Sequence, residues 1–194
     1  MAEPAEQLVT TRTLSTADFA APIGDRYFED YETGAVYEYA YVEVTEAEIL
    51  AFARRFDPQP IHVDATFAAA GPFGGLIASG WHTGAIFMRM FADHYVTRVA
   101  SLASPGIDEL RWPAPLRPGD RLRLRATTVE TRRSRSKPDR GLVRTRGELL
   151  NQDGQTVLSL IAMNLFRLRD AADGRGAGDG GAGGGGAGGG GARA

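Results

Sequence analysis

The chain has 194 residues, of which 43% are hydrophobic, so it can bury a core but is short for two full domains. Its formal net charge of -2 gives no support to nucleic-acid binding through overall electrostatics. It contains no cysteine, which excludes disulfides, thiolate metal sites and a cysteine nucleophile within this chain.

The two ends of the sequence differ from its middle. Residues 1–25 are polar and aperiodic and show no apolar segment typical of a secretion signal, so we expect a flexible N-terminal extension there. Residues 170–194 are mostly glycine and alanine, which offer few side chains to bury, so we expect a disordered tail. No run of about 18 apolar residues occurs. We therefore expect one domain over 26–169 in a cytoplasmic protein that has no contact with membranes.

The first clear elements are a strand and a short helix. Apolar and polar residues alternate over 36–44, and β-branched and aromatic side chains are frequent, which predicts a strand. Thr45 and Glu48 then match a capping box, and apolar residues at helical spacing predict a short helix that ends near Phe56.

The rest of the chain predicts one long helix and several strands. Pro58 and Pro60 cannot continue the first helix, so an irregular stretch is expected up to Gly80. Residues 81–96 are apolar on most sides, which predicts a helix buried against a sheet. Four strand candidates, separated by turn sequences, follow at 107–112, 120–130, 141–152 and 155–168. This order predicts an α+β fold in which a curved antiparallel sheet wraps around a long central helix.

The segment FDPQPIHVD, residues 56–64, places a carboxylate and an imidazole on a proline-stiffened loop. Taken alone, Asp57 is compatible with a turn cap, and His62 with a buried structural histidine. Asp64 is a candidate N-cap for the turn that follows it. A carboxylate and an imidazole held close together can also act as an acid-base pair.

This loop lies inside a longer segment that resembles a known family. Residues 44–84, VTEAEILAFARRFDPQPIHVDATFAAAGPFGGLIASGWHTG, look like the signature of the MaoC-like acyl dehydratases, which include the R-specific enoyl-CoA hydratases of the hotdog fold. The family pattern is Asp, one residue, usually Asn-Pro, one apolar residue and then His. Asp57, Pro60 and His62 match this pattern, whereas Gln59 replaces the usual Asn. Segments on both sides extend the likeness over most of 26–169.

The resemblance implies a single hotdog domain that interconverts 2-enoyl-CoA and (R)-3-hydroxyacyl-CoA, carried on CoA or on acyl carrier protein. Asp57 and His62 are then the acid-base pair, supported by Gln59. The N–H of Gly80, at the start of the long helix, is the donor to the thioester oxygen, and Ser79 beside it is a capping or positioning hydroxyl. No metal or redox cofactor is expected, because three histidines at unrelated positions do not form a metal site.

Two other functions remain open at this point, a hotdog acyl-CoA thioesterase and a non-catalytic, dimeric acyl-binding module. We expect a homodimer, because a single hotdog leaves sheet edges exposed. The basic stretch 132–140 is expected to be a solvated hairpin, with contacts from Arg133 or Arg135 to the CoA phosphates as the alternative.

Overall fold

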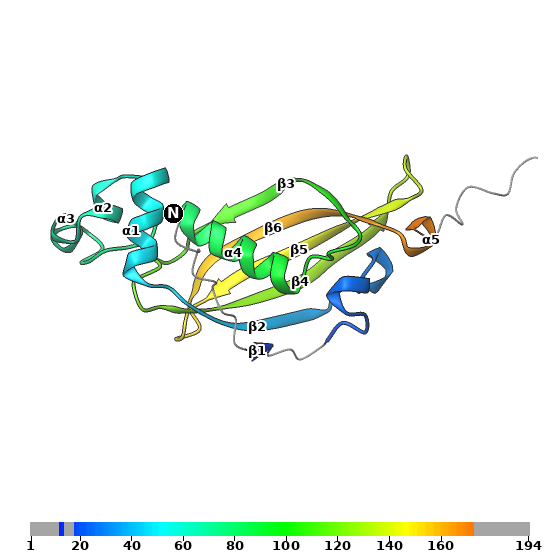
Figure 1. Ribbon diagram of the computed structural model, residues 1–194, viewed down its shortest axis with the longest axis horizontal. Helices are drawn as coiled ribbons and strands as arrows, with labels where there is room; N and C mark the ends of the chain where they lie inside the picture. Colours follow the sequence, from blue (N-terminus) through cyan, green and yellow to red (C-terminus); the bar gives the residue numbers. More distant parts are fainter. Residues whose placement is uncertain (1–11, 14–17, 173–194) are drawn as a thin grey trace, which may run out of the picture.

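The computed structural model describes residues 12–13 and 18–172, and its main feature is a curved antiparallel sheet with one long helix lying across it (Figure 1). The strand order is β1-β2-β4-β5-β6-β3, and every neighbouring pair is antiparallel. The strands are β1 (Arg12–Thr13), β2 (Val36–Glu43), β3 (Ser101–Arg111), β4 (Arg121–Arg133), β5 (Arg140–Leu150) and β6 (Thr156–Arg167). The helices are α1 (Glu46–Phe56), α2 (Pro60–Val63), α3 (Ala65–Ala70), α4 (Gly80–His94) and α5 (Arg169–Ala172), with short 3-10 turns η1 (Ile23–Asp25) and η2 (Phe28–Asp30).

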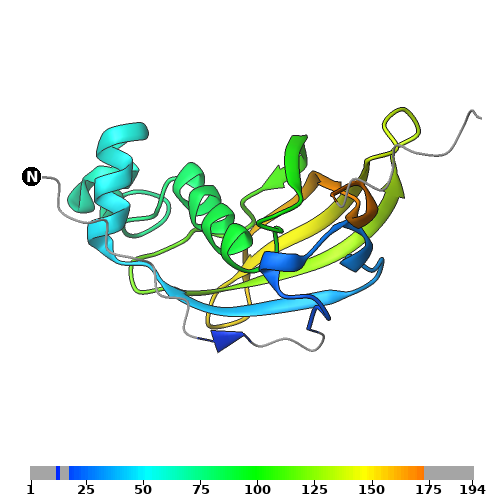
Figure 2. The same ribbon diagram turned by 45° about the vertical axis from the view of Figure 1, so that its right-hand side comes forward.

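The core lies between α4 and the inner face of the sheet, which curves beneath the helix (Figure 2). Side chains of β4, β5 and β6 alternate between buried and more exposed positions, as the period of a strand requires. The buried face of α4 includes Ile86, Phe87, Met90 and Phe91. The Phe87 ring of α4 packs directly against Gly147 in β5, where a Cβ atom would clash with it. Glycine at this position therefore lets the helix approach the sheet closely. The predicted α+β arrangement is confirmed.

The predicted capping box at the start of α1 is also confirmed. The Thr45 hydroxyl accepts from the Glu48 N–H at 3.2 Å, while the Glu48 carboxylate accepts from the Thr45 N–H at 2.8 Å. The stretch before Gly80, expected to be irregular, instead contains the short helices α2 and α3. The reason is positional: Pro60 is the first residue of α2, where its missing N–H costs no hydrogen bond.

Strand β3 begins at Ser101, six residues before the predicted start, and forms an edge of the sheet next to β6. Its pairing with β6 is interrupted by three register shifts, which indicate bulges. Much of β3 is exposed, including Ile107 with 54% of its surface accessible. The long helix α4 also exposes two large apolar side chains, Trp81 and Met88, so it is less completely buried than its composition predicts.

The described part of the predicted N-terminal extension packs against the domain. The Phe19 ring stacks on Tyr37 with ring centres 4.0 Å apart, and the Arg26 guanidinium lies 3.4 Å from the centre of the Phe19 ring. Arg26 also donates to the carbonyl oxygens of His94 and Tyr95, at 3.0 and 2.9 Å. It therefore caps the C-terminal end of α4.

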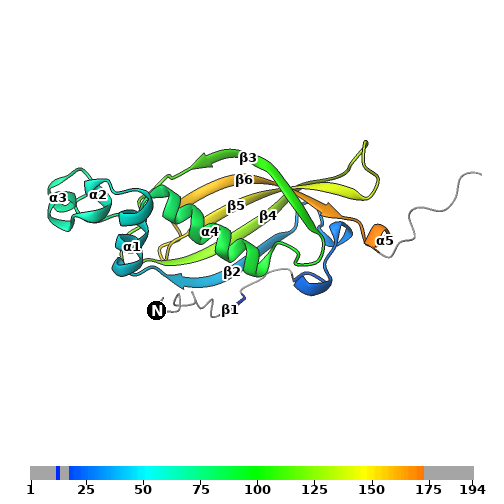
Figure 3. The ribbon, with the colours of Figure 1, turned by 45° about the horizontal axis from the view of Figure 1, so that its top comes forward.

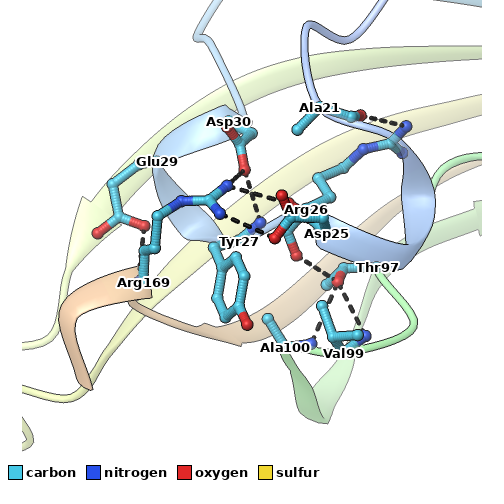
Figure 4. Close-up of polar contacts among 10 residues, drawn as sticks. All are labelled: Ala21, Asp25, Arg26, Tyr27, Glu29, Asp30, Thr97, Val99, Ala100 and Arg169. Carbon is cyan, nitrogen blue, oxygen red and sulfur yellow. Dashed lines mark hydrogen bonds and ion pairs between the residues drawn. The ribbon is translucent and has the colours of Figure 1, made fainter. Parts of the chain in front are cut away.

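A second arginine attaches the C-terminal end of the described chain to the same region (Figure 4). Arg169, at the start of α5, donates to Asp25 Oδ1 at 2.9 Å and to Asp30 Oδ2 at 2.8 Å. Its backbone N–H donates to Glu29 at 3.1 Å. Of the predicted disordered tail, 170–194, residues 170–172 instead belong to α5, which the contacts of Arg169 attach to the domain, and the rest lies outside the described residues. None of the helices within the described ranges is long and apolar enough to cross a membrane.

Candidate active site

Three helix ends bring the predicted site residues together at one end of the sheet (Figure 3). Asp57 is the C-cap of α1, where the chain leaves the helix ahead of Pro58. His62 lies in α2, which begins three residues later. Ser79 is the N-cap of α4 and lies beside Asp57, although 22 residues separate the two in sequence.

Two side chains donate hydrogen bonds to the Asp57 carboxylate. The Ser79 hydroxyl donates to Oδ2 at 2.6 Å, and the Gln59 amide donates to Oδ1 at 2.7 Å. These bonds, with the Ser79 bond as the larger cause, hold the pKa of Asp57 below its usual value of 3.8, and the nearby His62 lowers it further. Asp57 is therefore ionised at neutral pH. The Gln59 side chain, which replaces the usual Asn of the family pattern, therefore reaches the carboxylate.

The imidazole of His62 is buried, and its orientation is set by the backbone. Its Nδ1 lies 2.9 Å from the carbonyl oxygen of Ile77, which can only accept, so Nδ1 carries the proton in the neutral ring. The other nitrogen, Nε2, then presents a lone pair toward Asp57 Oδ2 at 3.6 Å. Two acceptors at this separation do not bond to each other, but one water molecule can donate a hydrogen to each of them.

The start of α4 supplies donors next to this pair. Gly80 is the first residue of the helix, so its N–H has no intrahelical carbonyl to bond, and it lies at the positive end of the helix dipole. The Ser79 hydroxyl accepts from the Trp81 N–H at 3.2 Å while it donates to Asp57. The Ser79 carbonyl accepts from the N–H and the hydroxyl of Thr83, at 3.1 and 3.2 Å. The backbone on either side of Gly80 is therefore fixed, through the Ser79 carbonyl before it and the Trp81 N–H after it.

A mostly apolar pocket of about 240 Å³ opens beside these groups. His62, Gly80 and Thr83 line it together with apolar side chains from two loops. Those apolar residues are Phe73, Ile77, Ala78, Trp112, Pro113, Ala114, Pro115 and Leu116. A small acyl group bound here would lie next to both the imidazole and the helix N-terminus.

Two other polar residues near the site, Asp64 and His82, stabilise or pack within the fold. Asp64 accepts from the N–H groups of Thr66 and Phe67 and so caps α3, as predicted. His82 is buried, its ring stacks on Phe52 with centres 4.8 Å apart, and burial lowers its pKa. Within the described ranges, no group of three or more His, Asp or Glu side chains is placed to hold a metal ion.

The basic stretch 132–140 forms the exposed hairpin between β4 and β5, as expected. It projects from the end of the sheet opposite α1, α2 and α3 (Figure 1). Arg133 pairs with Glu29 at 3.4 Å. Within one chain the hairpin is thus remote from the candidate site.

Two contacts of the site had no signal in the sequence. The Ile77 carbonyl that orients His62 is a backbone group, which any residue type would provide. Trp112 follows β3 directly, and its indole N–H donates to the Gly80 carbonyl at 2.9 Å. Trp112 was predicted as the last residue of a strand, and nothing in that pattern indicated a contact with the first residue of α4.

Replacing Ser79 with alanine is expected to destabilise the protein more at neutral pH than in acid. A carboxylate whose pKa is lowered on folding stabilises the folded state above its unfolded pKa, and this contribution is lost as the pH falls through the folded pKa. The difference between the variant and the wild type should therefore shrink below about pH 4. The lost N-cap leaves a pH-independent cost of about 0.5–2 kcal/mol. Urea unfolding at several pH values measures both parts, and a difference that stays constant into acid contradicts the role of the Ser79–Asp57 bond.

Comparison with known proteins identifies the family of this arrangement. The family model described as the MaoC like domain matches residues 30–147. The 3-hydroxyacyl-thioester dehydratase Z of Mycobacterium tuberculosis is 37% identical over 117 residues, which cover 59% of this chain and 72% of that protein. The crystal structure of the MaoC-like dehydratase from Rhodospirillum rubrum is 39% identical, covers 74% of this chain and 98% of its own, and superposes with a TM-score of 0.68.

A more distant neighbour from Mycobacterium tuberculosis, described as a double hotdog fold, superposes with a TM-score of 0.62. It is 20% identical, and the match covers 76% of this chain and 46% of that chain. At this identity the comparison is evidence for the fold alone. The predicted hotdog fold is thereby confirmed. Because the matched family model spans more than half of the sequence, the chain belongs to the MaoC-like dehydratase family.

Proposed function

We propose that the protein is a hydratase or dehydratase of acyl thioesters, interconverting a 2-enoyl-CoA and an (R)-3-hydroxyacyl-CoA. The observation that carries this proposal is the pair of acceptors, His62 Nε2 and Asp57 Oδ2, 3.6 Å apart beside the N-terminus of α4. Such a pair can hold and deprotonate the water that adds to the β-carbon. The R stereochemistry follows from the family resemblance.

The two members of the pair have different roles. Asp57 is a weak base because Ser79 and Gln59 lower its pKa, so it orients the water and stabilises the charged imidazole. His62 Nε2 is the general base, since Nδ1 is already occupied by the Ile77 carbonyl. In hydration the water oxygen bonds to the β-carbon while its proton passes to Nε2, and the electron pair of the carbon–carbon double bond moves toward the α-carbon and the thioester oxygen. The proton now on Nε2 is then transferred to the α-carbon, which returns His62 to its neutral form. Dehydration reverses these steps.

The N–H of Gly80 is the proposed donor to the thioester oxygen. Negative charge develops on this oxygen as the β-carbon is attacked, and a fixed backbone donor stabilises it most in the transition state. Both Gly80 and His62 line the same pocket, so one bound thioester can meet both groups.

The names of relatives support the reaction class. The 3-hydroxyacyl-thioester dehydratase Z and a 3-hydroxybutyryl-CoA dehydratase, 32% identical over 106 residues, both carry dehydratase names for 3-hydroxyacyl thioesters. A small acyl group suits the pocket beside His62, so crotonyl-CoA is a reasonable first substrate.

One assay tests the proposal directly. Purified protein is incubated with crotonyl-CoA while the enoyl absorbance and the free thiol are followed together. Loss of the enoyl signal without thiol release is the expected result. Thiol release would instead indicate a thioesterase, and no change with a series of enoyl-CoA chain lengths would contradict the hydratase assignment.

The hydrogen bond from Gln59 leads to a further prediction. Gln59→Glu keeps the size of the side chain but replaces the donor with a second negative charge beside Asp57, which raises the pKa of Asp57. We expect kcat/KM to fall about tenfold, the effect of losing roughly 1.5 kcal/mol from a hydrogen bond to a charged group. The acid limb of the pH profile should also move to higher pH. Gln59→Asn, which retains the donor, is the matched control and should lose less activity.

We also propose that the protein is a homodimer. Strand β3 is at the edge of the sheet and exposes Ile107, and an uncovered edge of this kind is usually paired. Analytical ultracentrifugation at micromolar concentration should show a dimer. A strict monomer under these conditions would contradict the proposal.

A further inference from the structure

The indole of Trp112 lies directly against the first residue of α4. Its Nε1–H donates to the Gly80 carbonyl oxygen at 2.9 Å, across 32 residues of sequence. A Cβ atom built on Gly80 would lie 2.7 Å from Cε2 of the indole, too close for any real contact. The space that a larger residue would need is therefore already filled by Trp112.

This contact completes the anchoring of the backbone around Gly80. The peptide before Gly80 is held through the Ser79 carbonyl, which accepts from Thr83. The peptide after Gly80 is held at both of its polar atoms. Its N–H, which belongs to Trp81, donates to the Ser79 hydroxyl, and its carbonyl accepts from Trp112. Trp112 is the member of this set that comes from outside α4 and its cap.

Trp112 is also placed to affect the ligand site. It lines the same pocket as His62 and Gly80. Its ring also meets Trp81 edge-to-face, with ring centres 5.7 Å apart, an aromatic contact that a phenylalanine at position 81 would keep. Backbone donors stabilise a transition state only when they are aimed in advance, and small displacements are costly.

We propose that Trp112 is a positioning residue whose indole, bonded to the Gly80 carbonyl and packed on its Cα, aims the Gly80 N–H at the thioester oxygen. The role rests on the proposed function, because it requires that this N–H stabilises the charge on that oxygen. It also gives a physical reason for glycine at position 80, independent of the ligand. The alternative is that Trp112 only packs, or only forms a wall of the acyl pocket.

Trp112→Phe separates these roles, because it keeps an aromatic wall and removes the donor. The matched control is Trp81→Phe, which makes the same substitution on the neighbouring indole, 63% exposed and not a lining residue of the pocket. With crotonyl-CoA, Trp112→Phe should lower kcat about tenfold with little change in KM, since the oxygen becomes charged only in the transition state. Trp81→Phe should leave both constants within about twofold. Equal kinetics in the two variants, or a raised KM with an unchanged kcat for Trp112→Phe, would overturn the proposal.

The steric part is tested without any substrate. Gly80→Ala should lower the melting temperature of the wild type, because the new methyl group displaces the indole. In a Trp112→Ala background the same change should be neutral or stabilising, because alanine favours a helix over glycine. An equal loss in both backgrounds would overturn the packing role of Trp112.

These measurements also separate the proposed function from the role of Trp112. A wild type that shows no hydration or dehydration of any enoyl or 3-hydroxyacyl thioester removes the proposed function, and the positioning role falls with it. An active wild type in which Trp112→Phe behaves like Trp81→Phe removes only the role of Trp112.

Discussion

Asp57→Asn is expected to lower kcat for crotonyl-CoA hydration about a thousandfold, within the range for removing a member of an acid-base pair. The neutral amide has nearly the same shape as the carboxylate but no charge to stabilise an imidazolium. Its NH₂ group can also donate to His62 Nε2 and so block the lone pair that should receive the proton. The variant should still fold, because Asp57 is partly exposed at the end of α1.

Asp64→Asn is the matched control for this change. Asp64 lies seven residues away and caps α3 through its Oδ1 atom, a role that asparagine fills equally well. We expect near-wild-type kcat and an unchanged melting temperature for this variant. Steady-state kinetics and thermal melts of both proteins make the comparison. Near-wild-type turnover in Asp57→Asn would show that the pair is wrongly assigned.

The parts of the fold that the sequence predicted well are those specified by nearby residues. The Thr45–Glu48 capping box and the helix ending before Pro58 depend on side chains within one turn of each other. The strands that form β4, β5 and β6 carry a long alternating pattern, so only their ends shifted. Elements of this kind need no knowledge of the rest of the chain.

The misassigned segments are those in which tertiary contacts or position outweigh composition. Residues 101–106 contain Pro105 and Gly106 and resemble a turn, but edge pairing with β6 extends the strand through them. Pro60 acts as a helix breaker when it follows α1 and as a helix start in α2. Composition alone does not separate these two uses of proline.

The candidate site shows the same division. The loop that carries Asp57 and His62 could be found from its motif, and the family resemblance gave Ser79 as a hydroxyl beside Gly80. The hydrogen bond from Ser79 to Asp57 was not part of that expectation. The contact between Trp112 and Gly80 depends on how the segment after β3 packs against α4, and no local pattern encodes it. Contacts of this range are visible only once the sheet and the helix are assembled.

His62→Ala is expected to lower kcat by about a hundredfold to ten-thousandfold, because it removes the proposed general base. His62 is buried and bonded to the Ile77 carbonyl, so the change should also cost about 1–3 kcal/mol of folding free energy for the unpaired carbonyl. His94→Ala is the control for a histidine on the same domain, since His94 stacks on Tyr39 at the other end of α4. It should retain turnover.

Added imidazole separates the chemical role of His62 from its structural role. The alanine variant leaves a gap beside Asp57 and the pocket, where a free imidazole molecule can bind and accept the water proton. Turnover of His62→Ala should then rise with imidazole concentration and follow the fraction of the neutral form as the pH changes. The Asp57→Asn variant should gain nothing, because its missing group is the carboxylate. If imidazole fails to restore turnover in a folded His62→Ala protein while His94→Ala loses as much activity, His62 supports the fold and the proton acceptor must be sought elsewhere in the pocket.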